Sequence, residues 1–278
     1  MTAKKIRMKQ KGRYTVKTVL VTGAFGGMGR AVSAALRDRG YRVLALDRVT
    51  GDAEDGIIPI EADLTSEESV IRAMEEAKSY TGSLCAIVHF AGIYMLDSLC
   101  EMEEAEFRRI FEVNLFGAYR INRIFLPMLE KGGRILITTS ELAPLDPLPF
   151  TGIYAVSKGA LEKYAYSLAM ELQLLGIQVS VLRAGAVNTG MLGASADALE
   201  RFCGKTRLYN CNADRFRAIV NRVEARCIPP EKLAEKALRI LETKHPAFAY
   251  SINRNPLLLL LNTLPKRIQL AAIRMILK

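Results

Sequence analysis

The chain has 278 residues, of which half are hydrophobic and 24% are charged, so it can bury a sizeable core and is not disordered throughout. Its net charge of +10 resides at the two ends: residues 1–13 contribute +6, residues 246–278 contribute +5, and the body between sums to −1. A near-neutral body argues against a nucleic-acid groove. Five cysteines without a C-x-x-C pair and only two histidines argue against a disulfide framework or a metal site and favour a reducing cytoplasm.

Short apolar segments alternate with longer helical patterns along the body. Segments that are apolar throughout predict parallel strands buried on both faces, with helices between them. We therefore expect a single α/β domain with a doubly wound parallel sheet and helices on both faces. The predicted strands are 16–21, 42–46, 57–60, 84–90, 134–139, 178–182 and 247–252, and the predicted helices are 30–39, 66–80, 103–130 (one helix or two in succession), 152–175 and 230–243.

A glycine-rich segment follows the first predicted strand. It reads Thr22-Gly23-Ala24-Phe25-Gly26-Gly27-Met28-Gly29. Glycines 23, 27 and 29 let the backbone turn tightly and approach a pyrophosphate, and the next helix presents the unpaired amides of its N-terminus to that anion. In the first βα unit of an α/β chain, this pattern predicts a dinucleotide site.

Asp47 ends the second predicted strand, 18 residues after Gly29. A carboxylate at this place can accept hydrogen bonds from the adenosine-ribose hydroxyls, and its charge repels a 2′-phosphate. NAD is therefore favoured over NADP. Arg48 keeps NADP open, because an adjacent guanidinium can bind that phosphate.

Tyr154 and Lys158 form a Y-x-x-x-K pattern near the start of a predicted helix. At i and i+4 the two side chains share one face of the helix. A nearby ammonium favours the phenolate and lowers the pKa of the phenol, so the tyrosine can exchange a proton with an alcohol or a ketone. The pattern is common by chance, but here it follows the fifth strand of a sheet whose first turn is rich in glycine.

Together with Asp63 after the third strand and Asn114 in Val113-Asn114-Leu115-Phe116-Gly117, these motifs resemble the classical short-chain dehydrogenase/reductase family over residues 16–189. The resemblance implies a Rossmann-type fold, a dimer or tetramer, and catalysis by Asn114, Ser140, Tyr154 and Lys158. It also implies that Asn114 holds a helix bend and a water of the proton relay. The cofactor residues that it implies are Thr22, Gly23, Phe25, Gly27, Met28, Gly29, Asp47, Arg48, Asp63 and Leu64 near the adenine side, and Ala91, Gly92, Tyr154, Lys158, Val187 and Thr189 near the nicotinamide.

Three positions depart from the family pattern. The family's N-A-G reads Phe90-Ala91-Gly92, and its P-G reads Ala184-Gly185. The family serine lies 13 residues before the tyrosine, where this chain has Glu141. Because the intervening loop carries three prolines and absorbs a one-residue shift, we expect Ser140 to polarise the carbonyl. Thr139 is the second candidate, and Glu141 acting directly is disfavoured because its charge opposes phenolate formation.

Residues 190–228 lie where the family places its substrate lid. Met95, Leu148, Phe150 and Met191 fall in loops that should border the nicotinamide, and no arginine or lysine is obviously directed there. A lipophilic substrate is therefore favoured over a small charged acid. The leading hypothesis is NAD(P)-dependent interconversion of a secondary alcohol and a ketone on a steroid-, retinoid- or lipid-like molecule. The alternatives are a 3-oxoacyl-thioester reductase and a non-enzymatic protein that senses a dinucleotide.

Both ends of the chain are basic, and we separate them from the domain at 16–253. Residues 1–15 form a basic tail without the apolar core of a secretory signal. Residues 254–278 loosely resemble the C-terminus of hydroxysteroid and retinol dehydrogenases. On a helical wheel Arg267, Arg274 and Lys278 share one side, and Ile268, Ala272, Met275 and Ile276 cover another. Such a segment can lie on a membrane or cover its own protein or a partner subunit. We expect a cytoplasmic protein with at most peripheral membrane contact, since no apolar run approaches the roughly 20 residues of a span.

Overall fold

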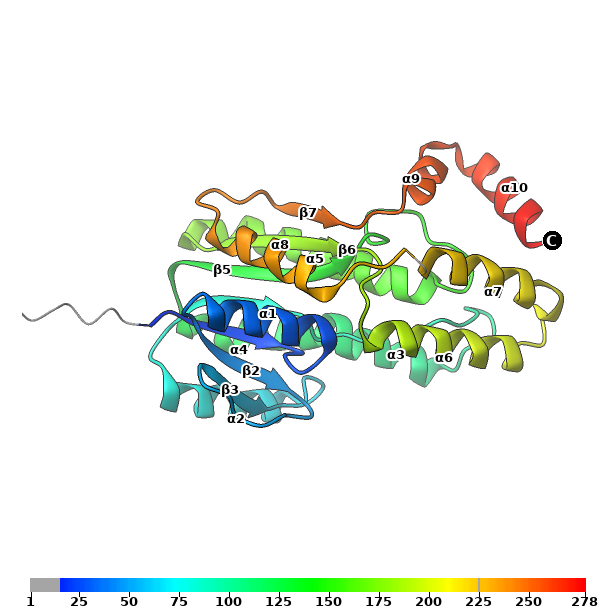
Figure 1. The fold of residues 1–278 in the computed structure, drawn as a ribbon. Coiled ribbons are helices and arrows are strands. Elements are labelled where there is room, and N and C mark those ends of the chain that lie inside the picture. The colour runs from blue at the N-terminus through cyan, green and yellow to red at the C-terminus, as the bar shows by residue number, and fades with distance from the viewer. Residues whose placement is uncertain (1–15, 225) are drawn as a thin grey trace, which may run out of the picture.

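The computed structural model describes residues 16–224 and 226–278, so the basic tail predicted at 1–15 lies outside the described residues. A seven-stranded parallel sheet with the order β3-β2-β1-β4-β5-β6-β7 crosses the molecule (Figure 1). This arrangement confirms the predicted doubly wound α/β fold. The strands are β1 (Thr18–Thr22), β2 (Arg42–Asp47), β3 (Ile57–Glu61), β4 (Leu84–His89), β5 (Leu129–Ser140), β6 (Gln178–Ala184) and β7 (Ala249–Ile252).

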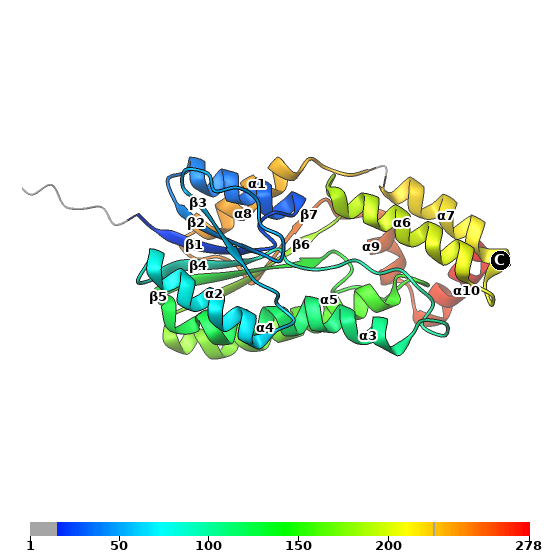
Figure 2. The ribbon, with the colours of Figure 1, turned by 90° about the horizontal axis from the view of Figure 1, so that it is seen from below.

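Helices cover both faces of the sheet. Figure 2 shows α1 (Gly27–Asp38) and α8 (Pro230–Glu242) on one face, and α2 (Glu67–Tyr80), α4 (Gly117–Phe125) and α5 (Gly152–Leu172) on the other. Successive residues of a strand point to opposite faces. Accordingly Val19 and Val21 of β1 join the core beneath α1 and α8, whereas Leu20 joins the core beneath α2, α4 and α5. The uninterrupted apolar strands of the sequence are thus explained by two cores.

The helix predicted at 103–130 is broken into several parts. It consists of α3 (Glu104–Phe111), a π-helical turn η1 (Glu112–Phe116), α4, and a short 3-10 turn η2 (Leu126–Met128), after which β5 begins at Leu129. A proline in the 3-10 turn, Pro127, ends the helical run. The π-helical turn contains Asn114, so the break falls at a residue that the sequence selected for function.

The lid region 190–228 is mainly helical. It contains α6 (Gly190–Lys205) and α7 (Asn210–Glu224), and a β-bridge between Val187 and Ile228 joins its two ends. Phe150 binds the lid to the body, because its ring lies 4.4 Å from that of Phe202 and 5.0 Å from those of Tyr209 and Phe216 (centroid distances).

The C-terminal segment forms two helices, α9 (Pro256–Thr263) and α10 (Lys266–Leu277), which lie at the same end of the molecule as the lid (Figure 1). The Asp146 carboxylate accepts a hydrogen bond from Gln269 at 3.0 Å and pairs with Lys266. The Asn212 amide of α7 donates to the Leu277 carbonyl at 2.7 Å. The sequence left three contacts open for this segment: a membrane, its own protein or a partner subunit. The structure shows contacts with the rest of its own chain.

Candidate active site

The glycine loop joins β1 to α1 in a conformation that excludes side chains. Gly23 has a φ of +66°, and a Cβ placed on it would lie 2.5 Å from the Ala91 amide nitrogen. A Cβ on Gly29 would lie 2.0 Å from the Gly23 carbonyl oxygen. These two positions require glycine because the loop folds tightly on itself and on the end of β4.

The N-terminus of α1 is open to a ligand. Its N-cap residue is Gly26, which has no side chain to bond the first amides of the helix. A Cβ on Gly27 would lie 2.5 Å from the Thr189 side chain, and Thr189 caps α6 by accepting a hydrogen bond from the Met191 amide. The N-termini of α1 and α6 thus meet at the carboxyl edge of the sheet, where uncapped amides and the helix dipole suit the pyrophosphate of a dinucleotide.

Asp47 lies over the glycine loop. Its carboxylate accepts hydrogen bonds from the Phe25 amide at 3.0 Å and from the Arg48 amide at 2.8 Å. The carboxylate is therefore held where β2 ends, beside the loop, while the Arg48 side chain is exposed. Through the hydrogen bond from the Phe25 amide, Asp47 connects the end of β2 to the glycine loop that follows β1.

Asp63 and Leu64 follow β3. The Asp63 carboxylate accepts hydrogen bonds from the Thr65 amide at 2.9 Å and from its hydroxyl at 2.7 Å, and these bonds lower the pKa of Asp63. Leu64 is buried, and its carbonyl accepts a hydrogen bond from Arg120 at 3.0 Å. Both residues are fixed at the carboxyl edge of the sheet by contacts within the protein.

Asn114 reaches from the π-helical turn to the end of β4 and to α5. Its carboxamide accepts a hydrogen bond from the Ile93 amide at 2.8 Å and donates to the Ile93 carbonyl at 3.0 Å and to the Ser157 hydroxyl at 3.1 Å. A Cβ on Gly92 would approach the Asn114 carbonyl oxygen to 3.1 Å and the Lys158 Nζ to 3.3 Å. Asn114 and Lys158 therefore face the same glycine, where a Cβ would press on both side chains.

Lys158 is buried and donates a hydrogen bond to the Thr138 carbonyl at 3.2 Å. Burial alone lowers the pKa of its ammonium to about 8. The ammonium nitrogen lies 6.0 Å from the centroid of the Tyr154 ring. The structure thus places the two members of the Y-x-x-x-K pattern on one face of α5, as their spacing predicts.

Tyr154 is enclosed between Ser140 and Tyr94. Burial raises the pKa of the Tyr154 phenol well above its ordinary value, and Tyr94, whose ring centroid lies 4.8 Å away, raises it further. A hydrogen bond with the Ser140 hydroxyl lowers the pKa of Tyr154 in partial compensation. We expected Lys158 to lower this pKa; instead desolvation dominates, because the ammonium is turned to the Thr138 carbonyl.

The three candidates for the polarising group have different partners. Ser140 bonds Tyr154, whereas the Thr139 hydroxyl donates to Glu162 at 3.2 Å. The Glu141 carboxylate points the other way and accepts a hydrogen bond from the Asn255 amide at 2.6 Å, at the start of α9. Of these three side chains, that of Ser140 interacts with the Tyr154 phenol.

Two features of the site were not foreseen. Tyr94 packs on Tyr154, and its position two residues after Gly92, at the carboxyl end of a buried strand, is the signal that could have indicated it. Phe150, expected in a loop that borders the nicotinamide, belongs to the aromatic cluster beneath the lid, and this cluster also includes Tyr94. Its φ of +64° is rare for a residue with a side chain.

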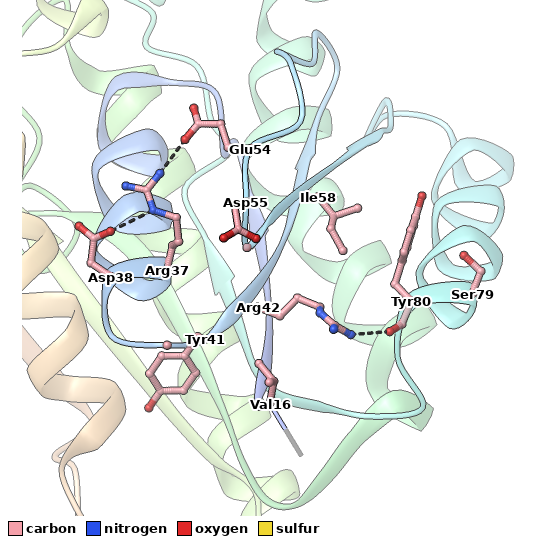
Figure 3. Close-up of a pocket in the computed structure, with 12 residues that line it drawn as sticks. Val16, Arg37, Asp38, Tyr41, Arg42, Glu54, Asp55, Ile58, Ser79 and Tyr80 are labelled. Atoms are coloured by element: carbon pink, nitrogen blue, oxygen red, sulfur yellow. Dashed lines mark hydrogen bonds and ion pairs between the residues drawn. The ribbon is translucent and has the colours of Figure 1, made fainter. Parts of the chain in front are cut away.

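A hollow in the surface lies far from these residues. It opens at the amino edge of the sheet, where Arg37 is paired with Asp38 and Glu54 and Arg42 donates to the Tyr80 carbonyl (Figure 3). None of the predicted site residues lines this hollow. In doubly wound folds ligands bind outside the carboxyl ends of the strands, so the amino edge is not the candidate site.

Known proteins share both the sequence pattern and the fold. The family model described as short chain dehydrogenase matches residues 17–200. An uncharacterized oxidoreductase of Escherichia coli, YbbO, is 36% identical over 184 residues, which are 64% of this chain and 68% of the relative. A 3-ketodihydrosphingosine reductase of Bacteroides thetaiotaomicron is 26% identical over 231 residues, which are 83% of this chain and 85% of the relative.

Two solved structures have the same fold over most of the chain. A short chain dehydrogenase of Burkholderia cenocepacia in complex with NADP has a TM-score of 0.71 at 24% identity and covers 92% of this chain and 96% of its own. A 3-ketoacyl-(acyl-carrier-protein) reductase of Brucella melitensis complexed with NADH has a TM-score of 0.69 at 25% identity and covers 85% and 96%. From the family match, the relatives and the fold together, the chain is an oxidoreductase of the short-chain dehydrogenase family, whose members use a nicotinamide dinucleotide.

Proposed function

We propose that this enzyme interconverts a secondary alcohol and a ketone on a lipophilic substrate, with NAD as the favoured partner in hydride transfer. The observation that carries the proposal is the contact between Tyr154 and Ser140, beside a buried Lys158, at the edge of the sheet where the glycine loop lies. A phenol and a hydroxyl that bond each other can both hold one substrate oxygen.

The proposed chemistry divides the work among these side chains. In oxidation, Tyr154 would take the alcohol proton, and in reduction it would return that proton to the carbonyl oxygen. A dinucleotide held at the glycine loop would supply the hydride chemistry. Ser140 donates a hydrogen bond to the same oxygen and stabilises its charge. In this structure the Lys158 ammonium bonds the Thr138 carbonyl. Turned toward Tyr154, with Asn114 close to it across Gly92, it would stabilise the phenolate that remains on Tyr154.

The residues at the carboxyl edge suit a dinucleotide. The start of α1 has no side-chain cap, the glycines let the loop fold closely, and Asp47 is held beside them. A fixed carboxylate at this place suits ribose hydroxyls and disfavours a 2′-phosphate, so we propose NAD, with Arg48 as the feature that would favour NADP. The proposed binding set is Thr22, Gly23, Phe25, Gly27, Met28, Gly29, Asp47, Arg48, Asp63, Leu64, Ala91, Gly92, Tyr154, Lys158, Val187 and Thr189.

Two observations support a lipophilic substrate. The lid meets the body through an apolar cluster in which Phe150, Phe202, Tyr209 and Phe216 contact one another. One relative takes its name from 3-ketodihydrosphingosine, a long-chain ketone. The 3-oxoacyl thioester alternative is favoured by the Brucella reductase. The site residues themselves do not distinguish the two substrate classes, and we rank the thioester second.

We also propose that the enzyme self-associates and contacts membranes only peripherally. Five large side chains of η1, α4 and α5 are exposed and could join a second copy: Phe116, Tyr119, Val156, Tyr166 and Met170. No helix within residues 16–224 and 226–278 is long and apolar enough to cross a membrane. Any membrane contact would therefore be made at the surface, and residues 254–278 are the candidates for it.

The proposal is tested by measuring turnover with NAD and NADP on a panel of hydroxysteroids, retinol, long-chain secondary alcohols and ketones, and 3-oxoacyl thioesters. We expect the lipophilic alcohol or ketone to give the highest kcat/KM. Tyr154→Phe should lower kcat by about 100-fold or more, since a well-placed acid–base group contributes about 10²–10⁴-fold. Binding of NADH, followed by its fluorescence, should persist. A Tyr154→Phe enzyme with nearly full activity would refute the proton-transfer role.

A further inference from the structure

The side of α9 and α10 that faces away from the protein carries an unusual number of exposed apolar groups. Five large apolar side chains there are between 50% and 80% exposed. We call them, together with the basic residues described next, the outer face of α9–α10. The apolar members are Leu257 and Leu260 of α9, and Ile268, Leu270 and Met275 of α10.

The same face is basic and free of acids. Arg267, Arg274 and Lys278 are exposed, and no aspartate or glutamate occurs in residues 246–278. The spacings of 7 and 11 residues correspond to about two and three helical turns, so these three side chains form one stripe along α10. Ile268 and Met275 lie beside this stripe on the exposed surface. Apolar residues flanked by basic ones are the pattern of a helix that lies in a membrane interface.

The helix cannot turn its apolar residues inward, because its other side is fixed. Gln269 is buried and donates to the Asp146 carboxylate at 3.0 Å and to the Leu264 carbonyl at 2.8 Å. At the far end of α10, the Leu277 carbonyl accepts from Asn212. The outer face of α9–α10 therefore remains exposed in the folded chain, and anything that covers it comes from outside.

We propose that the outer face of α9–α10 docks on the surface of an anionic lipid bilayer. Apolar side chains gain free energy on leaving water, and arginine and lysine gain from anionic headgroups. A second copy of this chain is a poorer partner. In a two-fold symmetric contact the same patch meets itself, which would bring the stripe of Arg267, Arg274 and Lys278 against its own copy without an acid to compensate.

Docking in this way would set the orientation of the active site. α9 and α10 lie at the same end of the molecule as α6 and α7 (Figures 1 and 2). Their inner side holds Asp146, in the loop between Ser140 and Tyr154, and Asn212 of the lid. The lid would then face the bilayer, from which a lipophilic substrate could enter. This last step rests on the proposed enzymatic activity, whereas the docking, which specifies the proposed peripheral membrane contact, does not depend on that activity.

The test is flotation of the full-length protein, with NAD present, on vesicles of phosphatidylcholine alone or with 30% phosphatidylserine, a fraction chosen to give about one anionic lipid in three. We expect binding to the anionic vesicles at low salt and its loss at high salt. Because each basic residue contributes about fivefold to the partition coefficient, Arg267→Gln with Arg274→Gln should lower it by about 25-fold. Leu270→Ser with Met275→Ser should weaken binding to both kinds of vesicle.

The matched control is Leu174→Ser with Leu175→Ser, which removes two exposed leucines at the opposite edge of the sheet. This control should float like the wild-type protein, and all variants should have wild-type melting curves. Wild-type protein that does not float on anionic vesicles at low salt overturns the proposal, whatever its activity. An equal loss of flotation in the control also overturns the proposal. So does a change in sedimentation of the α10 variants without a change in flotation, which would indicate a second copy as the partner.

Discussion

Separate substitutions of Ser140 and of its neighbour Glu141 give the sharpest test of which residue takes the place of the family serine. Ser140→Ala removes the hydroxyl that bonds Tyr154. One fixed donor to a developing oxyanion contributes about 100- to 1000-fold to kcat, and we expect a loss of that size. Glu141→Gln keeps the shape of the side chain and an oxygen that can accept from the Asn255 amide. Since this side chain points away from Tyr154, kcat should stay close to the wild-type value.

The free energy of unfolding gives a second test, which concerns Glu141→Gln. Burial raises the pKa of Glu141, against the hydrogen bond from the Asn255 amide and the charge of Arg254. A carboxyl with a raised pKa stabilises the fold at pH values below its ordinary pKa, and that contribution is lost as the pH rises through the raised value. Glu141→Gln lacks this loss, so its free energy of unfolding should improve relative to wild type between pH 4 and pH 7. Steady-state kinetics and urea unfolding at both pH values measure these effects. Equal losses of kcat in the two variants would refute the one-residue shift.

Two further predictions concern the cofactor and the lid. Asp47→Ala should lower kcat/KM with NAD by about 10- to 100-fold, the value of a hydrogen bond to a charged group, and leave NADP nearly unaffected; a wild-type enzyme that already prefers NADP would contradict the role of Asp47. Glu101→Ala removes the carboxylate that accepts from the Thr206 hydroxyl and from the amides of Arg207 and Leu208. Steady-state kinetics should show a higher KM with a nearly unchanged kcat, because the turn between α6 and α7 is loosened; an unchanged KM would argue against this link.

The fold could be read from the sequence because its strands are apolar on both faces. The seven strands from β1 to β7 each coincide with a predicted segment, and only their ends differ. The ends of helices were harder. The predicted helix 30–39 begins three residues earlier, at Gly27, since the glycines that shape the loop also form the first turn of α1. The break at the π-helical turn depends on the bonds of Asn114 to Ile93 and Ser157, which are distant in the sequence.

Neither the loop register nor the orientation of the tail could be read from a local pattern. Ser140 and Glu141 are adjacent polar residues, and only the packing of Glu141 against the start of α9 separates their directions. On a helical wheel the apolar residues of α10 suggest the buried side. In the structure Gln269 is the buried residue instead, because it bonds the Asp146 carboxylate, and Ile268 and Met275 are exposed. Long-range contacts of Gln269 with Asp146 and of Asn212 with Leu277 thus hold the inner side of this helix against the protein.

The buried ammonium of Lys158, which we propose to be catalytic, should lower the free energy of unfolding of the protein. Its pKa is lowered by burial from an ordinary value near 10.5 to about 8, which corresponds to about 3 kcal/mol at 1.36 kcal/mol per unit. Below pH 8 the lysine is charged in both the folded and the unfolded chain, so the penalty is complete. Between pH 8 and 10.5 the unfolded chain holds more protons, and the stability of the wild-type protein gains on that of a variant without the amine.

Lys158→Met should therefore be inactive yet more stable than wild type at pH 7, by at most about 3 kcal/mol, and this advantage should shrink toward pH 10. Urea unfolding of both proteins at pH 7, 9 and 10, without added nucleotide, measures the difference. An advantage that is absent at pH 7 or grows with pH would show that the ammonium is solvated or paired in the folded chain.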